Sequence, residues 1–250
     1  MDVSLQLYSI KEEAGQDFAK ALELTEKAGY DGVEFAGYYG NTPERIGELL
    51  IQYHLKPVSS HVSLERLRDD FEGELRYLNT LGFKLIVCPY SPCRTKEEVL
   101  ETAAFLQSCA LRTAEAGLVM GYHNHSHEFT ARFDGRYALD LLLEAAPALQ
   151  FEPDVFWIAN AGVDPAAYIK PYAAAGRICA VHAKDLAKAG AGKTGLNNVY
   201  IGEGRIDFPA IAAICPPSRY PYIIEQEEFS TDHFDGISQS LAGLRRLLPD

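Results

Sequence analysis

The chain of 250 residues is poor in the features that mark several large classes of protein. It contains no apolar run of membrane-spanning length and no charged-then-apolar leader, so we expect no membrane partner and a cytoplasmic location. Lysine and arginine are scattered without a basic stripe, and the formal net charge is −12. Nucleic acid is therefore not an expected partner.

The cysteines show neither the even number of a disulfide framework nor the spacing of a metal site. No histidine or other base is paired with them in the sequence. They read as buried thiols in a reducing compartment. These five residues are Cys88, Cys93, Cys109, Cys179 and Cys215.

The chain also lacks a glycine-rich phosphate loop after its first β-rich run, where residues 9–12 read SIKE. What it has instead is an alternation of β-rich runs and amphipathic helical stretches, which implies a parallel sheet. The expected strands are 3–8, 33–35, 56–62, 83–88, the histidine-rich stretch near 121–129, 149–155, 178–183 and 220–226. The expected helices are 16–29, 42–53, 64–81, 95–116, 138–146, 165–175, 208–214 and 232–248. Eight such units predict an α/β fold, a single (β/α)8 TIM barrel over 1–250, with a doubly wound open sheet as the alternative.

Residues 121–129, GYHNHSHEF, hold three of the seven histidines. On a strand, alternate side chains share a face, so His123, His125 and His127 are expected to point the same way. The preceding AGLVM indicates a helix end, a glycine cap and an apolar run. This places the histidines near the C-terminal end of the fifth strand, where barrels bind ligands. Alternatively, one histidine is a ligand and the others cap the strand or bond to backbone.

Ionisable residues also stand near the C-terminal ends of other expected strands. Burying so many of them is costly unless they are paired or bound to something. Histidine and carboxylate side chains without cysteine predict one divalent metal ion: Mn, Zn, Fe, Co or Mg. A salt-bridged barrel mouth without metal is the alternative. The residues concerned are Glu34, His61, His123, His125, Glu152, Asp154, His182, Lys184 and Glu225.

Six motifs follow one another in register, and two shorter ones precede them. Together they resemble the sugar phosphate isomerase/epimerase family, the xylose-isomerase-like TIM barrels that also include ketose 3-epimerases, inosose dehydratases and apurinic endonucleases. The resemblance covers nearly the whole chain. The motifs are YHNHSHEF at 122–129, FEPDVFW at 151–157, AGVDP at 161–165, VHAKD at 181–185, GEGRID at 202–207 and IEQ at 224–226, after LQLYS at 5–9 and YDGVEF at 30–35.

The resemblance implies that one divalent metal is held from the fifth, sixth, seventh and eighth strands, commonly by Glu, Asp, His and Glu. Matching motifs put Asp154, His182 and Glu225 at the last three positions. Relatives often read Glu-Asn-His at the first position, where this chain has His123 and, two residues later, His125. His123 is then the expected first ligand, and two histidines with two carboxylates suit Mn, which we favour, as well as Fe or Zn.

The resemblance further implies a sugar isomerase or epimerase that abstracts a proton next to a carbonyl, through a metal-stabilised enediolate. Glu225 is the better candidate base, and His125, Glu128 or His61 would supply the second proton-transfer group. With His123 at the first position, one of the two bases of the epimerases is missing or changed. A one-sided lyase or dehydratase acting on a keto-sugar or keto-glycoside is therefore the runner-up.

Four further side chains have expected roles near the site. Lys184 is expected to bind a substrate oxygen or stabilise the enolate, or else to be salt-bridged to Asp185 or Glu225. Glu34 is expected to orient a histidine or a substrate hydroxyl. Trp157 would form a wall against a sugar face or pack in the core. His61 is also a candidate for substrate binding.

Residues 202–205, GEGR, are either a weak phosphate cradle or a turn. Tyr38 and Tyr39 would line the barrel mouth or pack within their loop. An apurinic endonuclease is disfavoured by the negative charge, and a non-catalytic sugar-binding protein remains open. The expected partner is a small-molecule sugar, and association into a homo-oligomer is compatible with the fold.

Overall fold

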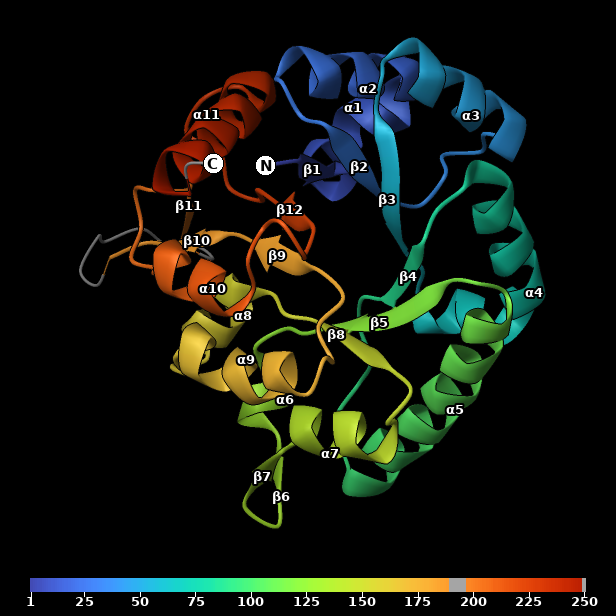
Figure 1. Cartoon of the computed structure of the whole chain (residues 1–250), viewed down its shortest axis with the longest axis vertical. Helices are drawn as coiled ribbons and strands as arrows, with labels where there is room; N and C mark the ends of the chain where they lie inside the picture. The colour runs from blue at the N-terminus through green and yellow to red at the C-terminus, as the bar shows by residue number, and fades with distance from the viewer. Residues whose placement is uncertain (189–196, 249–250) are drawn as a thin grey trace.

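The centre of the computed structural model, which describes residues 1–188 and 197–248, is a ring of eight parallel strands (Figure 1). Their order around the ring is β8-β5-β4-β3-β2-β1-β12-β9. Bridges between Phe151 and Ile178 and between Asp154 and His182 join the two outermost strands, so the barrel is nearly closed. The strands are β1 (Val3–Gln6), β2 (Gly32–Ala36), β3 (Lys56–His61), β4 (Leu85–Cys88), β5 (Val119–His123), β8 (Gln150–Glu152), β9 (Val181–Ala183) and β12 (Tyr222–Ile224).

Helices surround the ring, one after each strand (Figure 1). The local start and stop signals of the sequence act as expected: the Thr42 hydroxyl caps α3, with Pro43 at its first position, and Gly82 ends α4 with φ 75°. The predicted TIM barrel is thereby confirmed. The outer helices are α2 (Phe18–Lys27), α3 (Pro43–Gln52), α4 (Leu64–Leu81), α5 (Lys96–Glu115), α7 (Ala138–Ala145), α9 (Pro165–Ala174), α10 (Phe208–Ile214) and α11 (His233–Leu247).

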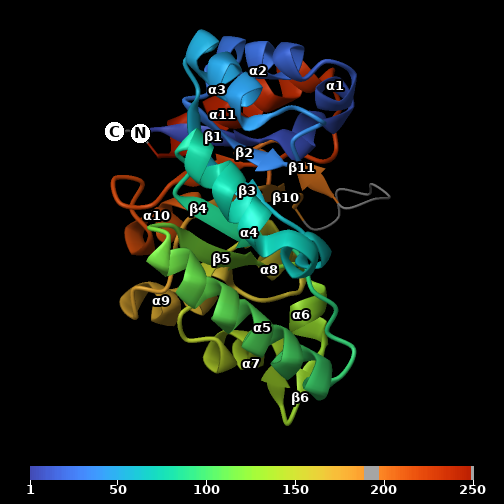
Figure 2. The ribbon, with the colours of Figure 1, turned by 90° about the vertical axis from the view of Figure 1, so that its right-hand side faces the viewer.

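Short elements that the sequence did not predict follow the C-terminal ends of several strands. In Figure 2, α6, β10 and β11 lie on the side of the barrel opposite the two chain ends. Eight such elements lie within the described residues. They are η1 (Leu7–Ile10), α1 (Lys11–Gln16), α6 (His127–Thr130), β6 (Arg132–Phe133), β7 (Arg136–Tyr137), α8 (Val155–Asn160), β10 (Asp185–Leu186) and β11 (Asn198–Val199).

Several of the predicted strands end earlier than expected, and for two of them the difference affects the site. The prediction that three alternate histidines share one strand face is wrong, because β5 ends at His123 and His127 begins α6. The sixth strand, predicted to reach Val155, ends at Glu152. Asp154 instead caps α8, where its carboxylate accepts the Trp157 amide. Capping a helix directly after a strand turns the chain outward and leaves the cap residue at the barrel rim.

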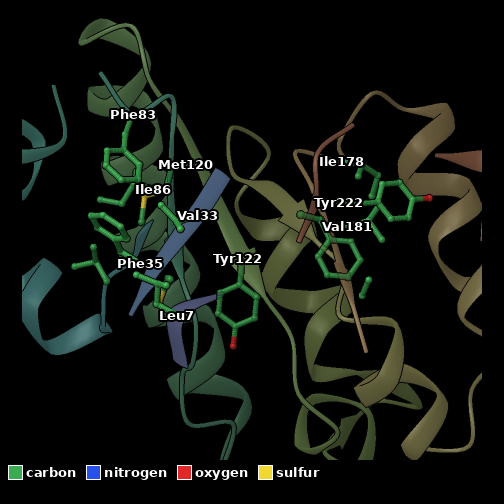
Figure 3. Packing of buried hydrophobic residues seen from close by; sticks show 14 of the residues in the cluster. Leu7, Val33, Phe35, Phe83, Ile86, Met120, Tyr122, Ile178, Val181 and Tyr222 are labelled. Atoms are coloured by element: carbon green, nitrogen blue, oxygen red, sulfur yellow. The ribbon is translucent and has the colours of Figure 1, made fainter. Parts of the chain in front are cut away.

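Alternate side chains along each strand point to opposite sides, into the core between strands and helices or into the barrel interior. Met120 and Tyr122 of β5 point into the main core between strands and helices (Figure 3), whereas Gly121 and His123 point inward. A Cβ on Gly121 would lie 2.8 Å from the Cys179 sulfur, so no larger residue fits there without a shift. Below the polar ends of the strands, the interior holds a small separate apolar cluster. It consists of Leu85, Val87, Ala180 and Ile223, with Val58 and Cys179 packed against it.

None of the helices in the described ranges combines the length and apolar character needed to cross a membrane.

Candidate metal centre

Three potential ligand atoms, from Asp154, His182 and Glu225, lie close together at the barrel mouth, and His123 approaches the first of them. Asp154 Oδ2 lies 3.4 Å from His182 Nδ1 and 3.8 Å from His123 Nε2. His182 Nδ1 is also 3.4 Å from Glu225 Oε2. All four residues are buried. The structure thus brings together the four residues that the sequence analysis selected.

The spacing and the bonding state of these atoms fit a divalent cation. Ligands about 2.0–2.2 Å from one metal ion lie roughly 3.0–3.6 Å apart. Asp154 Oδ2 and His182 Nδ1 are buried, and neither has a hydrogen-bond partner within the described part of the chain. Buried polar atoms without partners are destabilising, and a cation among these donors would satisfy them.

Each histidine of this group is oriented by a second carboxylate. His123 Nδ1 lies 3.2 Å from Glu152 Oε1, and His182 Nε2 lies 3.0 Å from Glu34 Oε1. A ring that donates its proton to that carboxylate presents the lone pair of its other nitrogen toward Asp154. Glu34 therefore takes the orienting place expected from the sequence. Glu152 takes the same role for His123, which the sequence analysis did not assign.

His61 lies between these two orienting carboxylates. Its Nε2 is 2.9 Å from Glu152 Oε1 and 3.1 Å from Glu34 Oε1. Burial lowers the pKa of His61, but the two carboxylates outweigh burial and raise it to about 10. Gln6 and Ser59 also donate to Glu34. His61 is thus a cation that helps to hold two buried carboxylates.

A second group of potential ligands comprises His61, His123, Glu152 and His182. Its neighbouring atoms are 2.9–3.2 Å apart and already hydrogen-bonded to one another, whereas Asp154 Oδ2 and His182 Nδ1 of the outer group have no such partner among the described residues. We therefore place the candidate metal centre at the outer group, Asp154, His182, Glu225 and His123. The inner group forms a hydrogen-bonded layer beneath it.

A cavity of about 440 Å³ opens beside this centre. Of the predicted site residues, its wall includes His61, His123, His125 and Glu225. The other predicted site residues do not line the cavity: the half-buried Trp157 and the buried Glu34, Glu128, Asp154, His182 and Lys184. The wall also contains Tyr8, Tyr38, Tyr90, Arg66, Glu74 and Glu227; Tyr38 alone of these was expected at the mouth.

Lys184 is fully buried behind Glu225. Its ammonium pairs with the Glu227 carboxylate and lies 3.8 Å from Glu225 Oε2. It also lies over the rings of Phe156, at 4.9 Å, and Trp157, at 4.8 Å. The expected contact with Glu225 is present. Glu227, 43 positions along the chain, was missed because no local pattern connects the two residues.

Asp185 does not pair with Lys184, because backbone amides surround its carboxylate. It accepts hydrogen bonds from Gly202, Gly204 and Ile206, as well as from Leu186. The segment 202–205 is therefore a turn wrapped around a carboxylate. Its amides are already engaged, which agrees with the turn reading and not with a phosphate cradle.

Glu128 fixes the residues that follow β5. Its Oε2 accepts the His125 amide at 2.8 Å, and its Oε1 accepts the Tyr122 hydroxyl at 2.9 Å. Burial raises the pKa of Glu128 to about 8 and lowers the pKa of His125 to about 4. His125 is therefore an uncharged ring at neutral pH, and its buried Nδ1 has no hydrogen-bond partner in the described ranges. The ring stands 5.2 Å from that of Trp157.

The family described as the xylose isomerase-like TIM barrel matches residues 22–247. The chain belongs to this family. No curated protein matches it.

Solved structures share the xylose isomerase-like barrel at low sequence identity. A sugar phosphate isomerase/epimerase from Parabacteroides distasonis ATCC 8503 is 23% identical with a TM-score of 0.78, covering 96% of each chain. The probable 3-DHS dehydratase AsbF from Bacillus anthracis is 15% identical with a TM-score of 0.72, covering 98% of each. The IOLI protein with a binding zinc atom is 17% identical with a TM-score of 0.75, covering 99% of this chain and 98% of the other.

These neighbours carry the names of more than one reaction class. Membership of the xylose isomerase-like family therefore establishes the barrel, while the reaction has to be argued from the residues of this chain.

Proposed function

We propose that this protein is a divalent-metal-dependent sugar isomerase or epimerase, which moves a proton next to a carbonyl group. The observation that carries this proposal is the close grouping of buried donor atoms of Asp154, His182 and Glu225, two of them without hydrogen-bond partners among the described residues, beside a cavity of about 440 Å³. His123 Nε2 lies 3.8 Å from Asp154 Oδ2. Tyr8, Tyr38 and Tyr90 in the cavity wall supply aromatic surface for the apolar faces of a sugar.

In this proposal, His123 Nε2, Asp154 Oδ2, His182 Nδ1 and Glu225 Oε2 hold the metal ion. Two imidazoles and two carboxylates suit Mn, Fe or Zn; we put Mn first, and the zinc atom named for the IOLI protein makes Zn the main competitor. When bound, such a cation polarises substrate oxygens and stabilises negative charge on them.

Glu225 is the proposed base, because its carboxylate lies in the cavity wall. Burial raises the pKa of Glu225, while Lys184 and His182 act against that rise. The result is a carboxylate of increased basicity beside a buried cation. Glu225 accepts the proton from the carbon next to the substrate carbonyl.

His125 is the proposed second group. Its ring is uncharged at neutral pH, lies in the cavity wall and has an unengaged Nδ1. It donates a ring proton to the substrate carbon from a direction different from that of Glu225; water then returns a proton to the ring, and Glu225 releases to water the proton that it accepted. Glu128 positions His125 through its backbone amide, and Lys184 acts through Glu225 and Glu227 without reaching the cavity.

A lyase or dehydratase on a keto-sugar or keto-glycoside is the second candidate. Among the described cavity residues, Glu74 is bound by Arg66 and Tyr38, and Glu227 is bound by Lys184. Glu225 is then the remaining cavity carboxylate that can act as a base, since His123 occupies the place of a second one. A single carboxylate suits abstraction on one face followed by loss of a β-substituent.

Both candidates can be tested in D2O with the purified protein, Mn²⁺ or Zn²⁺ and a panel of keto-sugars and keto-glycosides. Deuterium incorporation with all hydroxyl groups retained supports the isomerase or epimerase, and loss of a β-substituent supports the lyase. Glu225→Gln should lower the rate at least 100-fold, whereas Glu115→Gln on the exposed end of α5 should not change it. Absence of exchange and elimination with every metal and substrate would contradict both.

A further inference from the structure

A second hollow, of about 740 Å³, lies at the opposite end of the barrel. Its wall includes the first residues of several strands, among them Lys56 of β3, Leu85 of β4 and Val119 of β5, together with Ala110 and Ala114 near the end of α5. Parallel strands run from this end toward the histidine cluster, and the two chain ends lie on this side (Figure 2). The hollow is therefore separate from the candidate metal centre.

The floor and walls of this hollow are largely apolar. Leu118, Met120 and Ile178 contribute to the wall, as do Val58 and Cys179 of the small inner cluster. Val119 is 43% exposed, although it begins a barrel strand and its strand neighbours are buried. Apolar surface left open in a concave site is favourable for an apolar ligand, because binding removes that surface from water.

The charges at the hollow all have one sign. Its wall contains Lys56, Lys84 and Arg219 and no carboxylate within the described residues, in a chain whose net charge is −12. Lys56 pairs with Asp2. Within the described residues neither Lys84 nor Arg219 makes an ion pair, and the Arg219 guanidinium lies 5.1 Å from the Tyr220 ring. This local excess of cations favours an anionic ligand.

We propose that this hollow binds a small amphipathic carboxylate, whose apolar body lies against Met120, Val119 and the inner cluster while its carboxylate meets one of the rim cations, Lys84 or Arg219. The site does not depend on the proposed function of the barrel mouth. A medium-chain fatty acid such as decanoate has this chemistry.

The test is titration of the full chain with decanoate by calorimetry, with decanol as the uncharged match. Decanoate should bind at one site and at least tenfold more tightly than decanol. The double change Lys84→Glu with Arg219→Glu should weaken decanoate at least tenfold. Lys96→Glu reverses one charge at the far end of α5 and should not alter binding. Glu225→Gln, at the barrel mouth, should also leave it unchanged.

Because Lys84 and Arg219 are exposed, the charge-reversed variant should keep the circular dichroism spectrum of the parent, which separates lost binding from lost folding. Val119→Trp should block the hollow and abolish binding independently of charge. The proposal is overturned by absence of binding, by equal affinity for decanol, or by binding that survives these changes. It is also overturned if the hollow is covered by a second copy of the chain, seen as a dimer that the charge reversal dissociates and that excludes decanoate.

Discussion

Replacing Glu128 by Gln should change how stability depends on pH. The side chain is fully buried, and burial raises its pKa to about 8 from the ordinary 4.5. Between these two values the unfolded chain has an ionised carboxylate where the folded chain keeps a proton. The folded state therefore loses stability as pH rises from 4.5 to 8, and the loss is complete above pH 8.

The size of this effect follows from the difference between the two pKa values. Each unit corresponds to about 1.4 kcal/mol, so the carboxyl group removes roughly 4 kcal/mol between pH 5 and pH 8. Glutamine does not titrate and still offers an oxygen to the His125 amide or the Tyr122 hydroxyl. Relative to the parent, Glu128→Gln should gain on the order of 3–5 kcal/mol between these pH values.

Urea unfolding followed by circular dichroism at pH 5, 6.5 and 8 measures this difference directly. Glu115→Gln, on the exposed end of α5, is the matched control and should keep the pH dependence of the parent. If Glu128→Gln and the parent give parallel curves, Glu128 is ionised in the folded protein and the reasoning fails. The same variant separates two roles: a positioning residue should lose less than tenfold in kcat, whereas a proton-transfer group should lose 100-fold or more.

Three further outcomes follow from the structure. Gly121→Ala should lower the free energy of unfolding by about 1–3 kcal/mol, because the added Cβ would meet the Cys179 sulfur at 2.8 Å. Adding Cys179→Ala should recover part of this loss, and strictly additive effects of the two changes in thermal unfolding would refute the contact. Asp185→Ala should cost roughly 2–4 kcal/mol in urea unfolding, because four backbone amides lose their acceptor, whereas Asp69→Ala, on the exposed face of α4, should cost under about 0.5 kcal/mol; equal losses would show that the amides find other partners. Mn²⁺ or Zn²⁺ at 100 times its dissociation constant should stabilise the parent protein by about 2.7 kcal/mol, and a chelator should reverse this stabilisation. Asp154→Asn should remove the effect, and an unchanged melting temperature of the parent on adding metal would argue against the metal centre.

Much of the barrel could be predicted because its signals are local. Thr42 before Pro43 and Gly82 after Leu81 mark helix ends through interactions within a few residues. The positions of Asp154, His182 and Glu225 near strand ends were also predictable, since the C-terminal ends of parallel strands share one face of a barrel. The barrel topology alone therefore predicts that the side chains of these three residues lie close together.

Other features depend on contacts between distant segments. The β5 strand stops at His123 because the chain then turns into α6, held by Glu128, so His125 and His127 leave the strand face. No periodicity in the sequence distinguishes this ending from a longer strand. The pairings of Glu152 with His123 and of Glu227 with Lys184 join residues 29 and 43 positions apart, beyond any local pattern.

By itself, then, the sequence determined the eightfold alternation, the helix ends and the residue types gathered at the mouth, because hydrophobic periodicity and capping act over one turn or one strand. Only the tertiary structure decided which nitrogen of each histidine faces the candidate metal centre, which carboxylates orient it, and which charged groups lie behind the cavity wall. Those choices are set by distances between side chains on different strands, which exist once the barrel is nearly closed.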